Sequence, residues 1–518
     1  MLRMLTPIFR RIVPAVAVLA LVPVGVAAQS TPGLQVEVTL DPALPAQPAG
    51  RLVIVLAEGG AGVEPRHLIA RTGAGAVPTL GVDAPPLAPG GSVTLDSATA
   101  ARFPGQEVAD LPVDEYRVQA VLSTNRDLRA FDAPGNLISE VIQVNRDPER
   151  TGPVRVTLSR RLPEESMPQS TRFLRFIKLR SDLLSAFHGR PMYLRAGVIL
   201  PAGFEQEPER RYPLRVRIGG FGVRYTAVQS LMRPGSLFRA SWTDEDAAAP
   251  RMVLLHLDGA GPFGDPYQVN SANNGPFGDA VTQELIPYVE REFRGVGAPH
   301  ARVLEGSSTG GWVALALQMF YREVFNGAWA SCPVSVDFRA FQRVDIYGDT
   351  SAYVGERGGE RASARNLDGS VRFTMRHELG MENVLGRGDN WATSGRQWGA
   401  WNAAYGPRGT QGQPVPLWDP QSGRIDATVV RQWERYDLRL QLERQWDTLA
   451  PKLDGKLNIW VGDMDNYFLN EAVHLFEQFL TTKPPFDARI DYGQGRGHCW
   501  TGISAAEMAR EMESAVAQ

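Results

Sequence analysis

Hydrophobic and polar residues alternate with a period of two in the first third of the chain. The clearest runs lie at 34–40, 52–56, 116–122 and 154–158, and stretches rich in Pro and Gly separate them. Short alternating runs joined by turns, with no helical spacing between them, are typical of antiparallel β-sandwiches. The sequence therefore predicts an N-terminal β-sandwich domain over residues 29–165. It contains no catalytic pattern, so we interpret it as a packing or positioning domain, with an independent ligand-binding module as the alternative.

The pattern changes after a Pro-rich stretch at 163–168. Strand-like runs now alternate with helical ones, of which the clearest lie at 279–293 and 311–325. In the second, apolar residues recur at helical spacing from Trp312 to Phe320, which predicts an amphipathic helix. Alternating strands and helices predict a mostly parallel sheet with helices on both faces. We expect this α/β domain to occupy residues 170–518.

The strand and helix rhythm disappears between about 338 and 451. A segment of this length inside an α/β domain is more often an inserted lid or subdomain than a loop. Its aromatic rings either stack on a substrate or fill the small core of the insertion itself. The segment holds six of the eleven tryptophans, Trp391, Trp398, Trp401, Trp418, Trp433 and Trp446.

The first residues have the composition of an export signal. Arg3, Arg10 and Arg11 precede an apolar stretch at 12–26 that ends in Val-Ala-Ala. This order of basic, apolar and small residues predicts a signal peptide at 1–28, with an uncleaved anchor as the alternative. We expect a periplasmic or secreted protein with no stable membrane span after cleavage.

The overall charge argues against a polybasic nucleic-acid binder. The chain has 54 Lys and Arg residues against 57 Asp and Glu residues, a formal net charge of -3. Without an excess of cations it cannot displace many phosphate counterions, so we expect no nucleic-acid partner. The sequence also has no H-x-x-x-H pair, no P-loop and no dinucleotide fingerprint after a strand. We therefore expect neither a metal nor a cofactor.

One serine lies in a turn suited to a nucleophile. Residues 302–305 resemble a strand, a helix follows, and the joining sequence Gly306-Ser307-Ser308-Thr309-Gly310 reads G-x-S-x-G. Such a turn leaves room only for small residues around an exposed serine. Ser308 is the predicted nucleophile, and the backbone amide of Thr309 is a predicted oxyanion donor.

Two further residues complete the arrangement in the order Ser, Asp, His. Asp465 follows a buried strand at 457–461, and His498 follows the alternating run at 488–492. Each lies just beyond the C-terminal end of a strand, where open α/β sheets bind their ligands. His498 would take the proton of Ser308, and Asp465 would orient the imidazole. Asp463, two residues earlier, is the alternative acid.

Several motifs together resemble the putative-esterase branch of the α/β-hydrolases, which includes enterochelin, feruloyl and acetyl-xylan esterases, S-formylglutathione hydrolases and antigen 85 acyltransferases. They extend from about Phe173 to Gly502, apart from the insertion. Each motif alone is weak evidence for the resemblance, and the motifs taken together are specific to the family. The motifs are Leu200-Pro201-Ala202-Gly203-Phe204, Arg211-Tyr212-Pro213-Leu214, Ile218-Gly219-Gly220-Phe221-Gly222, the segment 284–290, Gly306 to Gly310, Gly462 to Asp465 and Gly497-His498.

The resemblance implies a Ser308, His498 and Asp465 triad that forms an acyl-enzyme. The acid of the family commonly stands three residues after the strand-end glycine, which selects Asp465 over Asp463. The first oxyanion donor follows a His-Gly pair in the family, and here Gly219-Gly220 makes it the amide of Phe221. Some members also carry an N-terminal Ig-like domain, in agreement with the predicted β-sandwich.

We therefore predict a serine esterase acting on carboxylic esters, with carbohydrate-linked or phenolic esters as the substrate class. A peptidase or acyltransferase with the same triad is the first alternative, and a non-catalytic glycan-binding protein is the second. The loop 259–278 should lie at the rim of the sheet, where its amides and hydroxyls either bind substrate or satisfy its own turns. Cys332 and Cys499 should flank the site, either as a disulfide or as free thiols lining the pocket.

Overall fold

The computed structural model describes residues 34–59, 62–105, 115–145, 152–243 and 250–517. The predicted signal peptide at 1–28 lies outside the described residues. Among the described helices, none combines the length and apolar character needed to cross a membrane.

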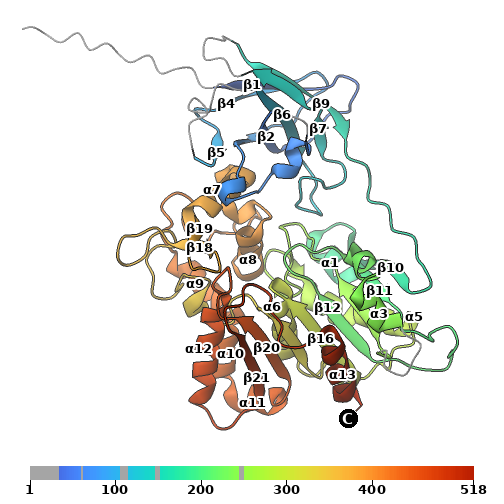
Figure 1. Cartoon of the computed structure of the whole chain (residues 1–518). Helices are drawn as coiled ribbons and strands as arrows, with labels where there is room; N and C mark the ends of the chain where they lie inside the picture. Colours follow the sequence, from blue (N-terminus) through green and yellow to red (C-terminus); the bar gives the residue numbers. More distant parts are fainter. Residues whose placement is uncertain (1–33, 60–61, 106–114, 146–151, 244–249, 518) are drawn as a thin grey trace, which may run out of the picture. The chain divides into compact units, whose positions relative to one another are not determined.

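The N-terminal strands form one hydrogen-bonded sheet (Figure 1) in the order β4-β1-β9-β7-β6-β2-β3-β5, with β8 paired to β6. The described pairs are antiparallel except β1 with β9, which is parallel. The prediction of purely antiparallel pairing is therefore wrong at this pair, where the first and last strands of the domain meet. The strands are β1 (Gln35–Leu40), β2 (Gly50–Glu58), β3 (Thr79–Ala84), β4 (Ser92–Asp96), β5 (Ala101–Phe103), β6 (Glu115–Ser123), β7 (Leu137–Ser139), β8 (Ile142–Asn145) and β9 (Val154–Arg161).

Strand β2 is buried on both faces, and this explains its unbroken apolar run. Leu52, Ile54 and Leu56 belong to the core of the N-terminal sheet. Val53 and Val55 point the other way and pack with residues of helix α7 (Met375–Leu385). Since successive side chains of a strand face opposite sides, one strand joins two hydrophobic cores. The N-terminal sheet is thereby packed directly against the later insertion.

The second sheet has eight described strands in the order β10-β11-β13-β12-β16-β17-β20-β21. From β13 to β21 the neighbours run parallel, as predicted, and β10 and β11 pair antiparallel at one edge. The strands are β10 (Leu174–Ser181), β11 (Met192–Ile199), β12 (Leu214–Ile218), β13 (Val253–Leu257), β16 (Arg302–Ser307), β17 (Ala328–Ser331), β20 (Leu457–Gly462) and β21 (Ala488–Gly493). A small hairpin, β14 (Asn270–Ser271) and β15 (Gly275–Pro276), lies in the loop after β13.

Helices cover both faces of this sheet. Leu255 and Leu304 belong to a large core with residues of α5, α6 and α12, whereas their neighbours Leu254 and Val303 belong to a smaller core with residues of α2, α3 and α13. This alternation is expected for strands buried on both sides. The helices are α1 (Asp182–His188), α2 (Val228–Leu231), α3 (Leu237–Thr243), α4 (Phe277–Asp279), a π-helical segment (Ala280–Leu285), α5 (Ile286–Glu292), α6 (Thr309–Phe320), α12 (Leu469–Thr481) and α13 (Ala505–Val516).

Helix α6 differs from its prediction in two ways. It ends at Phe320 rather than at 325, and every residue from Thr309 to Met319 is buried. The expectation of an amphipathic helix was wrong because residues outside the predicted apolar face, such as Val313 and Leu317, are buried as well, in a core that the helix shares with the insertion. The ring centroids of Trp312 in α6 and Tyr405 in the insertion lie 5.0 Å apart.

The insertion contains one hairpin, five α-helices and four short 3-10 helices among the described residues. Five of its six predicted tryptophans are at most 1% exposed. They belong to the same core as the large sheet, so the prediction of a separate small core was wrong. The elements are β18 (Ala362–Arg365), β19 (Val371–Thr374), α7, α8 (Gln397–Tyr405), α9 (Ala427–Trp433), α10 (Leu438–Arg444) and α11 (Trp446–Leu453).

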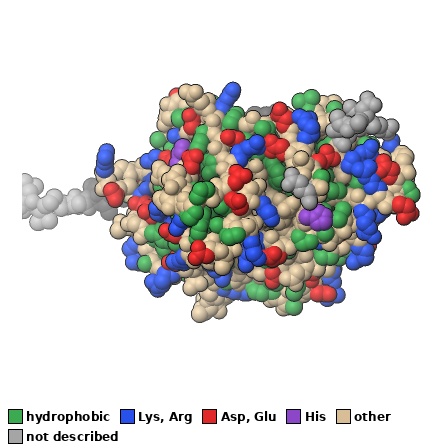
Figure 2. Space-filling view, turned by 90° about the horizontal axis from the view of Figure 1, so that it is seen from below, with side chains coloured by type: hydrophobic (Ala, Val, Ile, Leu, Met, Phe, Trp, Pro, Cys, Tyr) green, Lys and Arg blue, Asp and Glu red, His purple; other side chains and the backbone are tan. Residues whose placement is uncertain are grey.

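Acidic and basic side chains are interspersed over the face shown in Figure 2, in keeping with the small net charge. A partly buried example precedes the Ser308 turn, where Glu305 of β16 pairs with Arg215 at 2.6 Å and with Arg217 at 2.6 Å. Burial alone would raise the pKa of Glu305, but the two guanidinium groups lower it below its ordinary value. These pairs tie β16 to β12 directly below the turn that carries Ser308.

Candidate active site

Ser308 lies in a sharp turn between β16 and α6. Its backbone has φ 56° and ψ −121°, a conformation that residues other than glycine rarely adopt. A Cβ atom on Gly306 would lie 1.9 Å from the carbonyl oxygen of Gly310, and one on Gly310 would lie 2.2 Å from that of Ile218. Small residues at both positions are therefore required for the turn to form.

The structure brings Ser308, His498 and Asp465 into one hydrogen-bonded chain. The Nε2 atom of His498 lies 3.1 Å from Oγ of Ser308, and its Nδ1 atom lies 2.8 Å from Oδ2 of Asp465. Asp465 is fully buried, and its Oδ1 atom accepts the backbone N–H of Tyr467 at 2.9 Å. The alternative acid, Asp463, instead accepts the backbone N–H of Gly495.

His498 is held in place by contacts on several sides. Its backbone N–H donates to Oδ1 of Asn466 at 3.0 Å, and its ring meets the ring of Tyr467 edge-on, with centroids 4.9 Å apart. The next residue, Cys499, forms a disulfide with Cys332, with Cα atoms 4.8 Å apart. Of the two alternatives for the cysteines, the structure shows the bridge. Cys332, His498 and Cys499 lie close enough together to hold a metal ion, but in the disulfide the two sulfur atoms are not thiolate ligands.

The predicted oxyanion donors lie on either side of Ser308. Phe221 follows β12 through Gly219 and Gly220, and a Cβ atom on Gly220 would lie 3.8 Å from Cβ of Ser308. Thr309 is the first residue of α6, so its amide lies at the positive end of a helix. The predicted loop thus approaches the nucleophile even though Gly219 replaces the His of the family motif.

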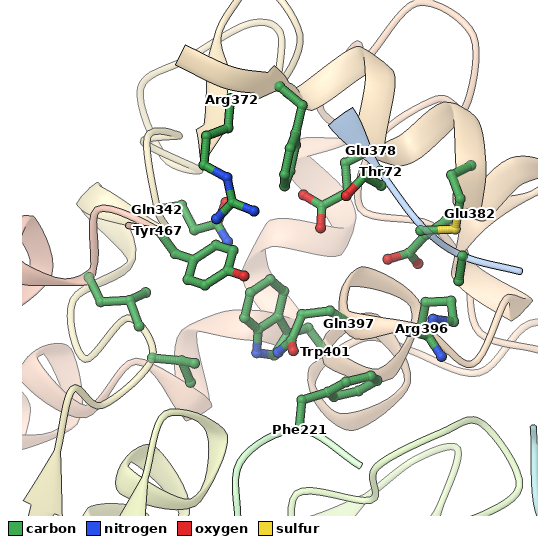
Figure 3. Close-up of a pocket in the computed structure, with 15 residues that line it drawn as sticks. Thr72, Phe221, Gln342, Arg372, Glu378, Glu382, Arg396, Gln397, Trp401 and Tyr467 are labelled. Carbon is green, nitrogen blue, oxygen red and sulfur yellow. The ribbon is translucent and has the colours of Figure 1, made fainter. Parts of the chain in front are cut away.

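A cavity of about 230 Å³ adjoins these residues. Figure 3 shows its lining, in which Arg372, Glu378 and Tyr467 point inward and Phe221 lies at the side near the sheet. Tyr467 is also the residue that contacts His498. The lining includes Phe221 and Tyr467 but none of Ser308, Asp465 and His498, so these two aromatic residues connect the cavity to the triad.

Two acidic residues of α7 face this cavity, and both are shifted in pKa. Burial raises the pKa of Glu382 to about 7, and it raises that of Glu378 as well. Glu382 accepts the backbone N–H groups of Trp398 and Gly399, each at 2.9 Å, at the start of α8. Burial lowers the pKa of Arg396, which the charge of Glu382 opposes. The cavity is thus polar, with charges of both signs.

Residues of the N-terminal region take part in this cavity, which the sequence did not predict. Ala70 and Thr72 line it. The backbone N–H of Gly73 donates to Nε2 of His377 in α7 at 2.9 Å. Arg51 of β2, which is 1% exposed, donates to the carbonyl of Val384 at 2.9 Å and pairs with Asp389 at 2.7 Å. No alternation or motif marks such contacts between segments more than 300 residues apart.

The polar loop at 259–278 does not offer its asparagines to the cavity. Asn273 donates from Nδ2 to the carbonyls of Ala403 and Gly406, at the end of α8. The backbone N–H of Asn274 donates to Oγ of Ser271 at 2.8 Å. The amide nitrogen of Asn273 thus stabilises the protein itself, whereas Nδ2 and Oδ1 of Asn274 are buried with no hydrogen-bond partner among the described residues.

Comparison with protein families decides the classification. A model of the family described as "Putative esterase" matches residues 189–450, just over half of the chain. The chain belongs to this family. Members of an esterase family hydrolyse carboxylic esters, so this protein is a carboxylic ester hydrolase. The matched range includes Phe221, Ser308 and Thr309, and it ends before Asp465 and His498.

Comparison with solved structures gives matches of low sequence identity. S-formylglutathione hydrolase from Agrobacterium tumefaciens is 14% identical, covering 68% of this chain and 98% of that one, with a TM-score of 0.37. Fluorophosphonate-binding serine hydrolase F from Staphylococcus aureus is 14% identical, covering 66% and 98%, with a TM-score of 0.37. A ferulic acid esterase from Anaeromyces mucronatus is 11% identical, covering 68% and 93%, with a TM-score of 0.31. Comparison with curated proteins gives no match.

Proposed function

We propose that this esterase is an exported serine hydrolase that uses Ser308 as nucleophile, His498 as general base and acid, and Asp465 as the orienting carboxylate. The observation that carries the proposal is the hydrogen-bonded chain of these three residues. Its first member, Ser308, lies on a strained strand-to-helix turn. The N-terminal composition at 1–28 supports export to the periplasm or beyond.

The chemistry proceeds in two halves. His498 Nε2 takes the proton of Ser308 as Oγ attacks the ester carbonyl carbon, and the negative charge that forms on the carbonyl oxygen meets the amides of Phe221 and Thr309. The intermediate expels the alcohol oxygen, which receives the proton from His498, and the acyl group stays on Ser308. A water molecule then gives its proton to His498 and attacks the acyl carbon. Collapse returns the proton to Ser308 and releases the carboxylic acid.

The substrates we propose are carbohydrate-linked or phenolic esters. The cavity next to Phe221 and Tyr467 combines the rings of these two residues and of Trp401 with charged and amide side chains. Aromatic faces pack against sugar and phenyl rings, and the polar groups orient hydroxyls. A panel of acetyl, feruloyl and longer-chain esters on sugar and simple alcohols tests this. Feruloyl or sugar esters should give the highest kcat/KM, and a preference for long aliphatic esters would contradict it.

We further propose that the N-terminal domain is a β-sandwich of the Ig-like type that positions the insertion. Residues from β1, β4 and β9 at one end of the strand order share one core with residues from β2 and β6. A shared core is expected where a sheet folds over itself into two layers. The role in positioning rests on the contacts of β2 with α7.

The choice of Asp465 as the acid is tested by a matched pair of variants. Asp465→Ala removes the carboxylate bonded to His498, whereas Asp463→Ala removes one that, among the described residues, accepts only the backbone amide of Gly495. We expect kcat to fall on the order of 10⁴-fold in the first and by less than about 10-fold in the second. The reverse order would assign the acid to Asp463.

A further inference from the structure

The loop after β13 contacts the elements that carry both oxyanion donors. We propose that Asp265 and Tyr267 of this loop are positioning residues: Asp265 holds the Phe221 loop through Gly222, and Tyr267 holds the start of α6 through Thr309. The inference rests on the proposed function, since it concerns the same oxyanion site. Neither residue touches the reacting atoms, so their effect would be on the placement of the two amides.

Asp265 holds the turn that carries the first donor, the backbone amide of Phe221. It is 3% exposed, and its Oδ2 atom accepts the backbone N–H of Gly222, the residue after Phe221, at 3.0 Å. Its Oδ1 atom accepts the backbone N–H of Tyr267 at 3.0 Å. Gly222 has φ 67°, which favours glycine. One buried carboxyl group therefore joins the Phe221 turn to the loop that carries Tyr267.

A backbone hydrogen bond also joins the Phe221 turn to the loop after β13. The backbone N–H of Gly259 donates to the carbonyl of Val223 at 2.9 Å. A Cβ atom on Gly259 would lie 2.7 Å from Oδ2 of Asp265, so the carboxyl group packs closely against this backbone. The Phe221 turn is consequently held between β12 and the loop after β13, although the His of the family motif is absent.

Tyr267 fixes the second donor. Its side chain is fully buried, and its hydroxyl oxygen lies 3.1 Å from Oγ1 of Thr309. The same hydroxyl accepts Nε2 of Gln397 at 2.7 Å. Its ring packs against Trp312 in α6, with centroids 5.9 Å apart. The side-chain hydroxyl of Thr309, which Tyr267 contacts, belongs to the same residue as the predicted donor amide. The hydrogen bond to Tyr267 therefore restrains the first turn of α6 and the position of that amide.

The bonds of Asp265 to Gly222 and of Tyr267 to Thr309 both affect the alignment of the two oxyanion donors. Donors to an oxyanion contribute fully only when both reach the same point at about 2.7–3.1 Å. Loss of an entire donor commonly costs about 10² to 10³-fold in kcat. Loss of a support leaves the donor in place but less well aligned, so we expect a smaller loss, on the order of 10-fold. Substrate binding before the reaction needs no oxyanion, so KM should change little.

Tyr267→Phe tests the proposal, because it removes one hydroxyl and leaves the ring. Tyr321→Phe is the matched control, since Tyr321 caps the C-terminal end of α6, the opposite end from Thr309, and its hydroxyl donates to Asp279 at 2.8 Å. We expect kcat of Tyr267→Phe to fall about 10-fold with KM within twofold, and both parameters of Tyr321→Phe to stay within twofold. Asp265→Asn, which keeps the shape but replaces one acceptor oxygen by a donor, should resemble Tyr267→Phe.

A transition-state readout separates positioning from general weakening of the fold. A trifluoromethyl ketone that adds reversibly to Ser308 should lose affinity in Tyr267→Phe by the factor by which kcat/KM falls. The matching methyl ketone, which adds poorly, should bind as before. Wild-type kcat in folded Tyr267→Phe would overturn the proposal, and so would a rise in KM alone. Should Asp265→Asn fail to fold, Tyr267→Phe still decides.

Failure of the proposed function gives a different result. Ser308→Ala is assayed in parallel with the same ester. If Ser308→Ala keeps its activity, the nucleophile is misassigned and the positioning proposal is overturned with it. If Ser308→Ala is inactive while Tyr267→Phe behaves as wild type, only the positioning proposal is overturned.

Discussion

Cys499 adjoins His498, and its disulfide with Cys332 ties this part of the chain to the end of β17. The backbone N–H of Cys332 donates to the carbonyl of Trp460 in β20 at 2.6 Å. The bridge therefore anchors the His498 loop to two neighbouring strands of the sheet, β17 and β20. It closes a loop of 167 residues that includes the whole insertion.

We expect the paired variant Cys332→Ala with Cys499→Ala to lose both stability and activity. Loss of a native disulfide commonly costs about 2–5 kcal/mol, and here it also frees the residue next to His498. Thermal unfolding and kcat for a p-nitrophenyl ester measure the two effects, and treatment of the wild type with a reductant should act in the same direction. An unchanged kcat in the paired variant would show that the bridge has no part in placing His498.

The glycines of the Ser308 turn should not tolerate a methyl group. Gly306→Ala would place Cβ 1.9 Å from a backbone oxygen of Gly310, and a backbone atom cannot move aside as a flexible side chain can. We expect loss of soluble protein or of activity, with destabilisation of about 4 kcal/mol or more.

Gly380→Ala in α7 is the control for the turn. Its Cβ would meet only Cδ2 of Phe103, at 3.8 Å, an ordinary contact. Because alanine favours a helix interior by about 0.5–1 kcal/mol over glycine, this variant should be slightly more stable than the wild type in a denaturant titration. A folded, fully active Gly306→Ala would contradict the description of the turn.

Arg51→Met should disturb the cavity without touching the triad. It removes the bonds to Val384 and Asp389 that hold α7, the helix of Glu378 and Glu382. We expect a stability loss of about 1–3 kcal/mol and a higher KM for a bulky ester, with little change for p-nitrophenyl acetate. Arg155→Met is the control, because Arg155 is 79% exposed and pairs only with Glu37 among the described residues. Equal KM values in both variants would argue against the role of the N-terminal domain.

His256 should make folding sensitive to acid. It is 1% exposed in β13, and burial lowers its pKa to about 4. Between about pH 6.5 and 4 the unfolded chain binds a proton at this residue that the folded protein does not, so stability falls as the pH falls. The loss attributable to this residue is on the order of 3 kcal/mol.

The variant His256→Phe removes this titration. Relative to the wild type, its free energy of unfolding should decline less steeply between pH 6.5 and 4, whatever its value at neutral pH. Urea titrations at several pH values measure the two slopes. Parallel curves would show that His256 is protonated in the folded protein as readily as in the unfolded chain.

The central sheet and the candidate triad could be predicted because local patterns carry them. The strands before Ser308, Asp465 and His498 appear as apolar runs, and the turn around Ser308 needs glycines at fixed positions. The order of the three residues along the chain then restricts the acid and the base to the last strands. The structure brings the same three residues within hydrogen-bonding distance.

The surroundings of the triad could not be predicted because they depend on contacts between distant segments. The contacts of α6 with the insertion could not be predicted, although α6 has no charged residue, a composition that itself indicates a helix buried on all sides. Asp265 and Tyr267 lie in a loop that stood out only for its asparagines. Thr72 joins the cavity solely because β2 packs against α7.

The most direct test of the account is the ester hydrolysis of Ser308→Ala, together with labelling of the wild type by a fluorophosphonate. We expect the variant to fold with an unchanged thermal midpoint, to lose p-nitrophenyl acetate turnover by about 10⁴-fold or more, and to take up no label. Mass spectrometry of the labelled wild type should place the adduct on Ser308 and on no other serine. Turnover retained by folded Ser308→Ala, or an adduct on another residue, would contradict the assignment of Ser308 as the nucleophile.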